Sequence, residues 1–201
     1  MLSLKRKEIS EENSVRLLAY TIILYISSIF VPFVVVASYQ SMVYYSKSQW
    51  FFTTPFSAYM TFMAGMLYIA VLLTIYLIFR QRWEGAAFNW TIRLLILISL
   101  PVFFLSLTNY YYVDEDGIHY NQLTGLREAD YKWEEMKTVH ILYRNHQGTT
   151  SYYQYKFELK DGRVLSLPYN EKFADNRRKI NGKIEQNQIK VKDNFDNPIE
   201  D

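Results

Sequence analysis

Three carboxylates stand together at Asp114, Glu115 and Asp116, directly before Gly117. Closely spaced acids that end in Gly also occur in calcium-binding loops, where side-chain oxygens hold the ion. Such a loop needs further ligands, above all a Glu at a fixed distance along the chain, and the sequence lacks it here. Asp-Gly between two short apolar runs is a strong β-hairpin signal, because Gly tolerates positive φ. We therefore interpret the segment as a turn and not as a metal site.

The histidines and one pair of glutamates are the other residues whose types suggest metal or acid–base chemistry. His119, His140 and His146 belong to no HExxH or similar ligand motif, so we expect them to be solvated surface residues. Glu134 and Glu135 are adjacent, so their side chains diverge and form a poor acid–base pair. The chain has no cysteine and no GxSxG, P-loop or GxGxxG motif. We expect no catalytic residue, no metal and no cofactor, and thus no enzyme.

Four bases in a predicted helix over residues 171–186 form the single candidate binding site. Clustered Lys and Arg attract anionic lipid surfaces and phosphate groups. A solvated helix face is the alternative, because Glu171, Asp175 and Glu185 are interleaved with the bases. Nucleic acid is not an expected partner, since the net charge of the chain is only +2. The candidate residues are Arg177, Arg178, Lys179 and Lys183.

The elements that carry these residues fall into two regions of opposite composition. Residues 17–46, 48–79 and 94–113 contain no charged side chain, although half of the whole chain is hydrophobic and 21% is charged. A membrane helix needs about 20 apolar residues, and its backbone must satisfy its own hydrogen bonds in lipid. We expect three transmembrane helices, near residues 17–39, 56–79 and 92–111. The first apolar run is too long for a signal peptide, which has a core of about 7–15 residues.

The orientation follows from the Lys and Arg residues near the ends of the predicted spans. Bases concentrate at the N-terminus and between the second and third spans, and cytoplasmic loops carry such an excess. We therefore expect a multi-pass cell-membrane protein with its N-terminus in the cytoplasm and its C-terminal domain outside. On the cytoplasmic side are Lys5, Arg6, Lys7, Arg16, Arg80, Arg82 and Arg93, against Lys47 on the other.

The predicted spans carry packing signals and lack the buried charges that transporters use. Pro32 and Pro101 should each remove a helix hydrogen bond and introduce a kink. Ser106 and Asn109, like the other polar residues of the spans, are expected to bond to carbonyls of their own helix. A stripe of small residues permits close helix contact, either within the chain or in a homo-oligomer. Its members are Ser57, Thr61 and Gly65.

From about residue 110 the apolar pattern changes to the alternation of β-strands. Strands are predicted at 110–113, 118–120, 126–133, 139–144, 152–160 and 163–167, followed by a helix over 171–186 capped by Asn170. A further short strand is predicted at 189–191. Because the segment lacks crossover helices, we expect antiparallel strands covered by that helix and no parallel βαβ sheet. The predicted core residues are Trp133, Tyr155, Phe157, Phe173 and Ile180.

The segment 110–186 resembles the bacterial pleckstrin-homology-like (PH-like) domain family. The matching pieces are the Asp-Gly hairpin before Ile118, the aromatic-Glu step at Trp133-Glu134-Glu135-Met136, and Leu167-Pro168 before the C-terminal helix. The resemblance implies a bent antiparallel sheet closed at one end by the helix, and it implies no catalytic residues. In that family a hydrophobic hairpin often precedes a cytoplasmic domain, whereas three spans and the distribution of bases place this one outside.

Together these patterns predict a membrane protein with four parts: a polar segment 1–16, a transmembrane region 17–111, a PH-like α+β domain 112–186 and a polar tail 187–201. The expected function is non-enzymatic, namely presentation of the domain for binding to a protein, a peptide or the membrane surface. The lipid bilayer is one expected partner, and the protein or peptide is undefined. The alternative is a subunit or accessory of a membrane transporter or channel, including one for peptide export or immunity.

Overall fold

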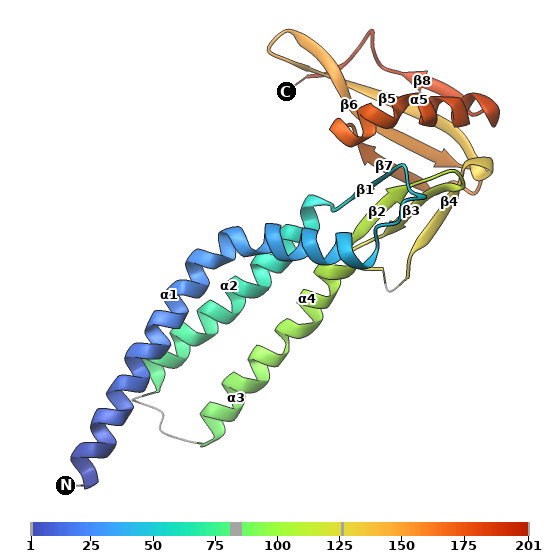
Figure 1. Cartoon of the computed structure of the whole chain (residues 1–201). Helices are drawn as coiled ribbons and strands as arrows, with labels where there is room; N and C mark the ends of the chain where they lie inside the picture. Colours follow the sequence, from blue (N-terminus) through green and yellow to red (C-terminus); the bar gives the residue numbers. More distant parts are fainter. Residues whose placement is uncertain (1, 81–85, 126, 201) are drawn as a thin grey trace. The chain divides into compact units, whose positions relative to one another are not determined.

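The computed structural model describes residues 2–80, 86–125 and 127–200 (Figure 1). The chain forms two compact units, which we call the helical unit and the sheet unit. The helical unit comprises Met1–Tyr45, Thr54–Tyr110 and Asn121–Leu126, and the sheet unit comprises Ser46–Thr53, Tyr111–Tyr120 and Arg127–Asp201. Each unit is described on its own below.

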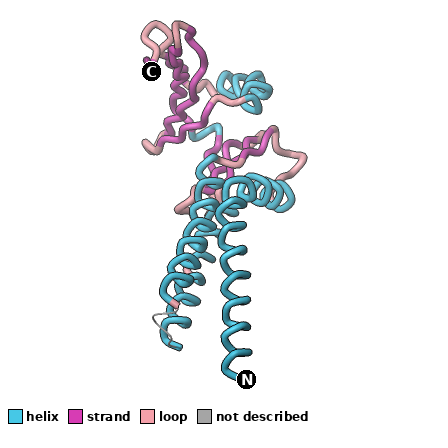
Figure 2. Tube along the Cα trace, turned by 90° about the vertical axis from the view of Figure 1, so that its left-hand side faces the viewer, coloured by secondary structure: helices cyan, strands magenta, loops and turns pink. Residues whose placement is uncertain are grey.

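The helical unit contains three segments that are long and apolar enough to cross a membrane, which makes the chain compatible with a multi-pass membrane protein. Large apolar side chains are exposed along them, such as Phe30 and Leu100, and lipid is the solvent that suits this surface. Figure 2 shows the long helices running beside one another. They are α1 (Leu2–Val43), α2 (Phe56–Phe79), α3 (Ala86–Leu97) and α4 (Ser99–Thr108), and the segments long enough to cross are Glu12–Val43, Phe56–Phe79 and Ala86–Thr108.

The two interior prolines act differently on their helices. The third segment divides into α3 and α4 at Ile98, because Pro101 has no N–H to donate to the carbonyl of Leu97. Pro32 lies inside α1, which continues as one helix. Figure 1 shows α1 changing direction part-way along, as expected when a proline removes one hydrogen bond from the ladder. The third segment ends at Thr108 rather than near residue 111, since the first strand after it begins at Tyr110.

Polar side chains join the helices of the helical unit to one another. Ser106 Oγ donates to the carbonyl of Ala58 at 2.7 Å, and Asn109 Nδ2 donates to Ser57 Oγ at 2.8 Å. Gln40 of α1 is fully buried, and its Nε2 approaches three carbonyl oxygens at the end of α4, including that of Asn109 at 2.9 Å. The prediction that Ser106 and Asn109 bond within their own helix was therefore wrong, because a neighbouring helix offers closer partners.

The stripe of small residues on α2 faces α4 of the same chain. A methyl group at Gly65 would lie 2.8 Å from Cε1 of Phe103, so the glycine permits the close approach of α4. Ser57, eight residues earlier, accepts the hydrogen bond from Asn109 described above. Gly65 and Ser57 therefore serve internal packing, and Thr61 lies between them in the sequence.

The sheet unit contains two sheets and one long helix. The first sheet has the order β1-β2-β3-β4, and the second has the order β7-β6-β5-β8 with β9 also paired to β5. A 3₁₀ turn at Trp133–Glu135 leads from the first sheet into the second. The elements are β1 (Phe51–Thr53), β2 (Tyr110–Val113), β3 (Gly117–Asn121), β4 (Ala129–Lys132), β5 (Met136–His146), β6 (Thr149–Leu159), β7 (Val164–Pro168), α5 (Glu171–Gln186), β8 (Lys190–Asp193) and β9 (Ile199–Glu200).

Both strands of the C-terminal tail pair with β5 in parallel, whereas only antiparallel strands were predicted. Thr138 lies opposite Lys190 in β8, and Arg144 lies opposite Ile199 in β9. The connection that returns the chain to β5 consists of β6, β7 and α5 together. The expectation of antiparallel strands was therefore wrong for β8 and β9, because this longer connection takes the place of a single crossover helix.

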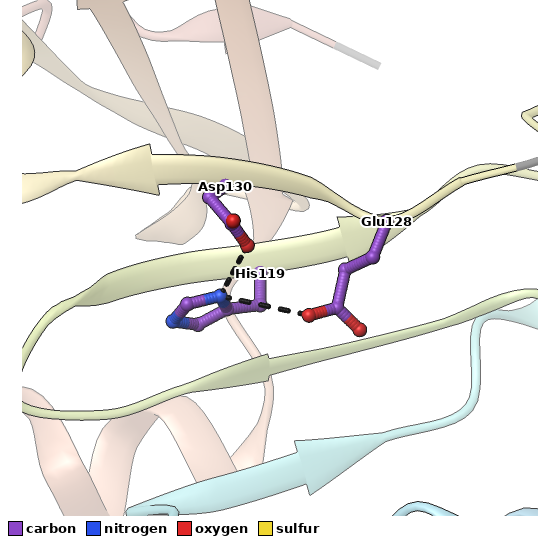
Figure 3. A group of neighbouring side chains, drawn as sticks. All are labelled: His119, Glu128 and Asp130. Carbon is purple, nitrogen blue, oxygen red and sulfur yellow. Dashed lines mark hydrogen bonds and ion pairs between the residues drawn. The ribbon is translucent and has the colours of Figure 1, made fainter.

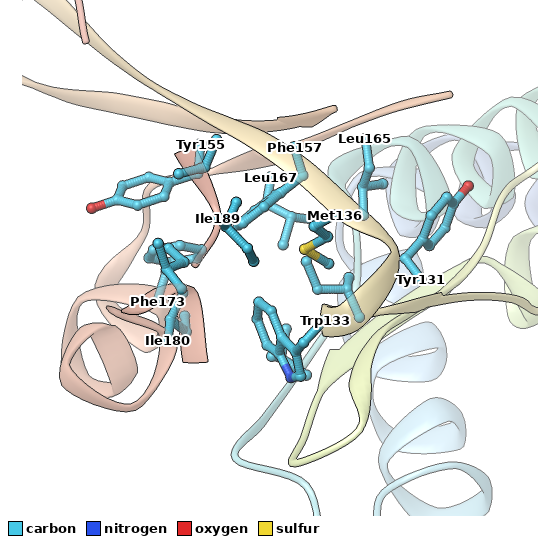
Figure 4. Close-up of a cluster of buried hydrophobic side chains, with 14 of the residues drawn as sticks. Tyr131, Trp133, Met136, Tyr155, Phe157, Leu165, Leu167, Phe173, Ile180 and Ile189 are labelled. Atoms are coloured by element: carbon cyan, nitrogen blue, oxygen red, sulfur yellow. The ribbon is translucent and has the colours of Figure 1, made fainter. Parts of the chain in front are cut away.

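The core of the sheet unit consists of the residues predicted for it. Trp133, Tyr155, Phe157, Phe173 and Ile180 are all at most 2% exposed, and Figure 4 shows them converging between the second sheet and α5. The predicted cap is also present, since Asn170 Oδ1 accepts the N–H of Phe173 at 2.9 Å. Large aromatic rings of this kind bury much apolar surface per residue, and aliphatic side chains such as Ile118 and Leu167 complete the core.

Two glycines, each of which follows an Asp in the sequence, have different physical roles. Gly162 has φ of +86°, so it supplies the left-handed conformation that its turn requires. Gly117 begins β3, and a Cβ there would overlap the carbonyl oxygen of Tyr131 on β4 and lie 2.9 Å from the carbonyl carbon. Gly117 is therefore required for the close approach of two strands, and not for a positive φ.

Candidate functional site

One face of the first sheet carries a group of ionisable side chains around His119. Ile118 of β3 and Tyr131 of β4 point into the core, so the alternation of a strand puts His119 and Asp130 on the opposite face. His119 lies directly opposite Asp130 in the β3–β4 register. Glu128 just precedes β4, and Figure 3 shows its carboxylate turned toward the imidazole. We call Asp114, His119, Glu128 and Asp130 the His119 cluster.

Both ring nitrogens of His119 lie close to carboxylate oxygens. Nδ1 is 2.7 Å from Asp130 Oδ1 and 3.7 Å from Glu128 Oε1, and Nε2 is 3.2 Å from Asp114 Oδ1. The His119 side chain is 14% exposed, so it is not the solvated surface residue that its sequence suggested. His119, Glu128 and Asp130 each bring one metal-ligand atom within 4.8 Å of the others, so these three residues have the chemistry to hold a metal ion.

Asp114 fixes the position of one side of the imidazole. Its Oδ1 accepts the backbone N–H groups of Asp116 at 3.0 Å and Gly117 at 3.1 Å, which confirms that the acidic segment forms a turn. The indole Nε1 of Trp133 donates to the Asp114 carbonyl at 3.1 Å. The carboxylate oxygen Oδ1 of Asp114, which closes the turn, therefore also faces Nε2 of His119.

Tyr112 of β2 holds the other components of the cluster. Its ring stacks on the imidazole of His119, with 4.5 Å between centroids and 11° between planes. Its hydroxyl donates to Glu128 Oε1 at 2.9 Å. Burial, followed by the hydrogen bond to Glu128 and the nearby carboxylates, raises the pKa of Tyr112 well above its usual range. Tyr112 thus remains protonated and keeps Glu128 oriented.

A pocket of about 570 Å³ adjoins the cluster within the sheet unit. Its lining includes His119 and Asp130 from the sheet, and Lys183 and Gln186 from the end of α5. Lys183 Nζ lies 2.8 Å from Glu115 Oε2, and this hydrogen bond lowers the pKa of the Glu115 carboxyl. The pocket walls carry both signs of charge, which suits a polar ligand or a hydrated ion better than an apolar molecule.

The four predicted bases on α5 are not gathered into one free cationic surface. The guanidinium of Arg177 lies 4.4 Å from the ring centroid of Tyr152, and Lys179 Nζ lies 5.6 Å from that of Trp50. Lys183 pairs with Glu115, as described above. Contacts of this kind lower the energy that a base gains from an external anion.

Arg178 differs from these three bases. It joins Arg177 and Glu185 in the lining of a second pocket, of about 470 Å³, on the surface of α5. The carboxylate of Glu185 opposes anion binding there. The anionic-surface site stays a prediction, and three of its four bases have aromatic or acidic neighbours.

The sequence analysis missed the His119 cluster because its members meet across strands. His119 and Asp130 are neighbours only through the β3–β4 register, which depends on the length of the irregular segment between the strands. One available signal was that Glu128 and Asp130, two residues apart, project to the same face of a strand-like segment. Glu134, by contrast, lies in the 3₁₀ turn at the edge of the pocket.

No protein-family model matches the chain, and neither a curated protein nor a solved structure matches it. The function is therefore inferred from the geometry of each unit.

Proposed function

We propose that the protein is a non-enzymatic multi-pass membrane protein that presents a PH-like domain for binding a protein or peptide. In the sheet unit, β2, β3 and β4 of the first sheet are followed in the chain by three further antiparallel strands and a C-terminal helix, while β1, from between α1 and α2, completes the first sheet. This order supports the PH-like resemblance, with β8 and β9 as an addition to it. Among the residues that line the charged pocket there is no Ser, Thr or Cys that His119 could activate as a nucleophile, which supports a binding role.

The observation that carries the proposal is the position of β1 in the chain. β1 lies between α1 and α2, yet it pairs with β2, which follows α4. The register joins Phe51 to Val113, Phe52 to Tyr112 and Thr53 to Tyr111. The domain is therefore joined to the predicted membrane segments at three points of the chain, from α1 to β1, from β1 to α2 and from α4 to β2, and not by one linker. This connection suits a module that must capture its partner beside the membrane.

The pairing of β1 with β2 also supports three spans. Strands of one sheet lie on one side of a membrane, so the chain between Thr53 and Tyr110 must cross an even number of times. Two crossings, by α2 and by the α3–α4 segment, meet this condition and leave the N-terminus on the other side. With the bases concentrated at the N-terminus and near residues 80–93, the sheet unit lies outside the cytoplasm in our proposal.

Single cysteines test this topology cleanly, because the chain has none of its own. In intact cells, Ser48→Cys and Ser151→Cys should both react with a membrane-impermeant maleimide, whereas Asn89→Cys should react only after the membrane is opened. All three side chains are exposed in the structure, so the label can reach them once it is on their side. Unequal reaction of positions 48 and 151 would contradict the shared sheet. If only position 89 reacts in intact cells, the sheet unit lies in the cytoplasm and the proposed orientation is wrong.

A protein or peptide is favoured over a lipid headgroup as the partner. Three of the four α5 bases already contact aromatic or acidic side chains, which weakens the site for an anionic membrane surface. The second sheet, however, ends at β7, which pairs with β6 only in the described structure. An extended peptide adds to such an edge through backbone hydrogen bonds.

The open edge of β7 presents specific backbone groups. Leu159 N donates to Arg163 O, and antiparallel alternation then directs the backbone groups of Leu165 and Leu167 toward β6. Those of Val164 and Ser166 point away from β6, and both residues are exposed. Pro168 shares this outward register, where a missing N–H leaves the β6 pairing intact.

A photo-crosslinker at Val164 in the full chain, in cells, should therefore form an adduct with one protein, and Ser166→Pro should abolish the adduct. Val191, which is equally exposed on β8, is the matched control position. Ser166→Pro removes only an outward N–H, so the unfolding transition of the sheet unit should change little. Equal adducts from positions 164 and 191, or adducts that survive Ser166→Pro, would count against strand addition at β7.

A further inference from the structure

We propose that His119, Glu128 and Asp130 bind a divalent transition-metal ion of the Zn²⁺ or Mn²⁺ type. The ion would occupy the space between His119 Nδ1 and the two carboxylates, beside the charged pocket. This site goes beyond the binding role proposed above, and it stands or falls independently of the β7 edge. It also revises the expectation, from the sequence, that the chain holds no metal.

The charge distribution around the imidazole is the first argument. A neutral imidazole has one N–H and one lone pair, but each ring nitrogen of His119 lies within 3.2 Å of a carboxylate oxygen. One nitrogen of a neutral ring would therefore point its lone pair at a carboxylate. A cation at that nitrogen, whether a proton or a metal ion, removes the repulsion. Nδ1 is the position where it gains most, because Asp130 and Glu128 both lie on that side.

The groups around the ligands also hold them in the orientation that a metal site requires. A metal-bound histidine usually donates its other N–H to a carboxylate or carbonyl, which fixes the tautomer. Asp114 Oδ1 is placed to accept from Nε2, and two backbone N–H groups hold Asp114 in turn. Tyr112 stacks on the imidazole and donates to Glu128. The outer partners of a metal site are thus present around His119 and Glu128.

The ligand types select the class of ion. Mg²⁺ and Ca²⁺ prefer ligand sets made of oxygen alone, whereas one imidazole with two carboxylates suits Zn²⁺, Mn²⁺ and related ions. Asp130 Oδ1 lies 2.7 Å from His119 Nδ1, which is closer than two ligand atoms on one ion usually lie. The Asp130 side chain is 59% exposed, so it can rotate and increase this distance. Because His119 and Asp130 also line the pocket, the remaining coordination positions face it. Water or a polar group of a ligand would complete the coordination.

Titration of the purified full-length chain in detergent with ZnCl₂ and with MnCl₂ tests the site. We expect one saturable ion per chain by calorimetry, with at least tenfold weaker binding of CaCl₂ and MgCl₂. His119→Gln and Asp130→Asn should each weaken Zn²⁺ binding at least tenfold. The matched control is His140→Gln, because His140 lies 3.7 Å from Glu158 but outside the cluster, and its affinity should be unchanged.

The imidazole signals of His119 distinguish a metal from a bound proton. Zn²⁺ should shift the Nδ1 resonance while Nε2 keeps its proton. If His119→Gln and Asp130→Asn unfold, Glu128→Gln serves in their place, because Gln and Glu side chains are nearly equal in size. This variant should reduce the Zn²⁺-induced shift. Binding that survives both His119→Gln and Asp130→Asn would overturn the proposal, as would the absence of any saturable site. Equal affinity for Ca²⁺ and Zn²⁺ would also overturn it, because an imidazole ligand would then contribute nothing.

Discussion

Replacing Phe173 by Ala should destabilise the sheet unit by about 3–5 kcal/mol, which is the usual effect of removing a fully buried Phe. Phe173 is 0% exposed, and its ring lies 4.6 Å from that of Tyr155 and 6.1 Å from that of Phe51. It therefore joins α5 to a strand from each sheet, and the cavity left by Ala would weaken both contacts. Near-UV circular dichroism of the detergent-solubilised full chain during guanidinium unfolding measures the effect.

Phe195 provides the matched control, because it is the same residue type with a 58% exposed side chain. Its ring makes an edge contact with Tyr143 at 5.1 Å, so Phe195→Ala should lower stability by no more than about 1 kcal/mol. Equal effects of the two substitutions would show that α5 does not form part of the core. The helical unit is not expected to change in either variant, because neither residue belongs to it.

Replacing Gly117 by Ala should also destabilise the sheet unit, by about 1–3 kcal/mol, through overpacking rather than a cavity. The new methyl group would overlap the backbone of Tyr131, which cannot move aside as a flexible side chain does. The pairing of β3 with β4 must then shift, and His119 would move relative to Asp130. The same variant should therefore weaken Zn²⁺ binding, although Gly117 offers no metal ligand.

Gly182 provides a control of opposite sign. It lies inside α5 with no atom within 4 Å of the position of a new Cβ, so Gly182→Ala should stabilise the helix by about 0.5–1 kcal/mol. Unfolding measurements on the two variants under one set of conditions compare them directly. A Gly117→Ala protein as stable as the parent would show that β3 and β4 do not approach as closely as described.

The elements with strong local signals were predictable from the sequence. α2 spans Phe56–Phe79 and α5 spans Glu171–Gln186, as expected from an apolar run and from a cap followed by a sparse apolar stripe. The aromatic core was also predictable, because large rings in alternating strands have no other place to be buried. These features depend on neighbours within one or two turns or strands of the chain.

The features that were missed depend on pairing between distant residues. β1 has only three residues, and its partner strand begins more than fifty residues later, so its sequence carries no local mark of a strand. The His119 cluster likewise depends on the register of two strands across an irregular segment. In the helical unit, the hydroxyl of Ser106 donates to the carbonyl of Ala58 rather than to a carbonyl of its own helix, because α2 lies so close. Packing partners of this kind cannot be read from a single segment.

The position of β1 has a consequence for biosynthesis. Phe51 and Phe52 leave the ribosome long before β2, and two further hydrophobic segments are synthesised before their partners Val113 and Tyr112 emerge. The first sheet therefore cannot close while its first strand is being made, and β1 waits for the synthesis of β2. A fragment that starts at residue 110 would lack β1 and expose an apolar strand edge, which makes it prone to self-association.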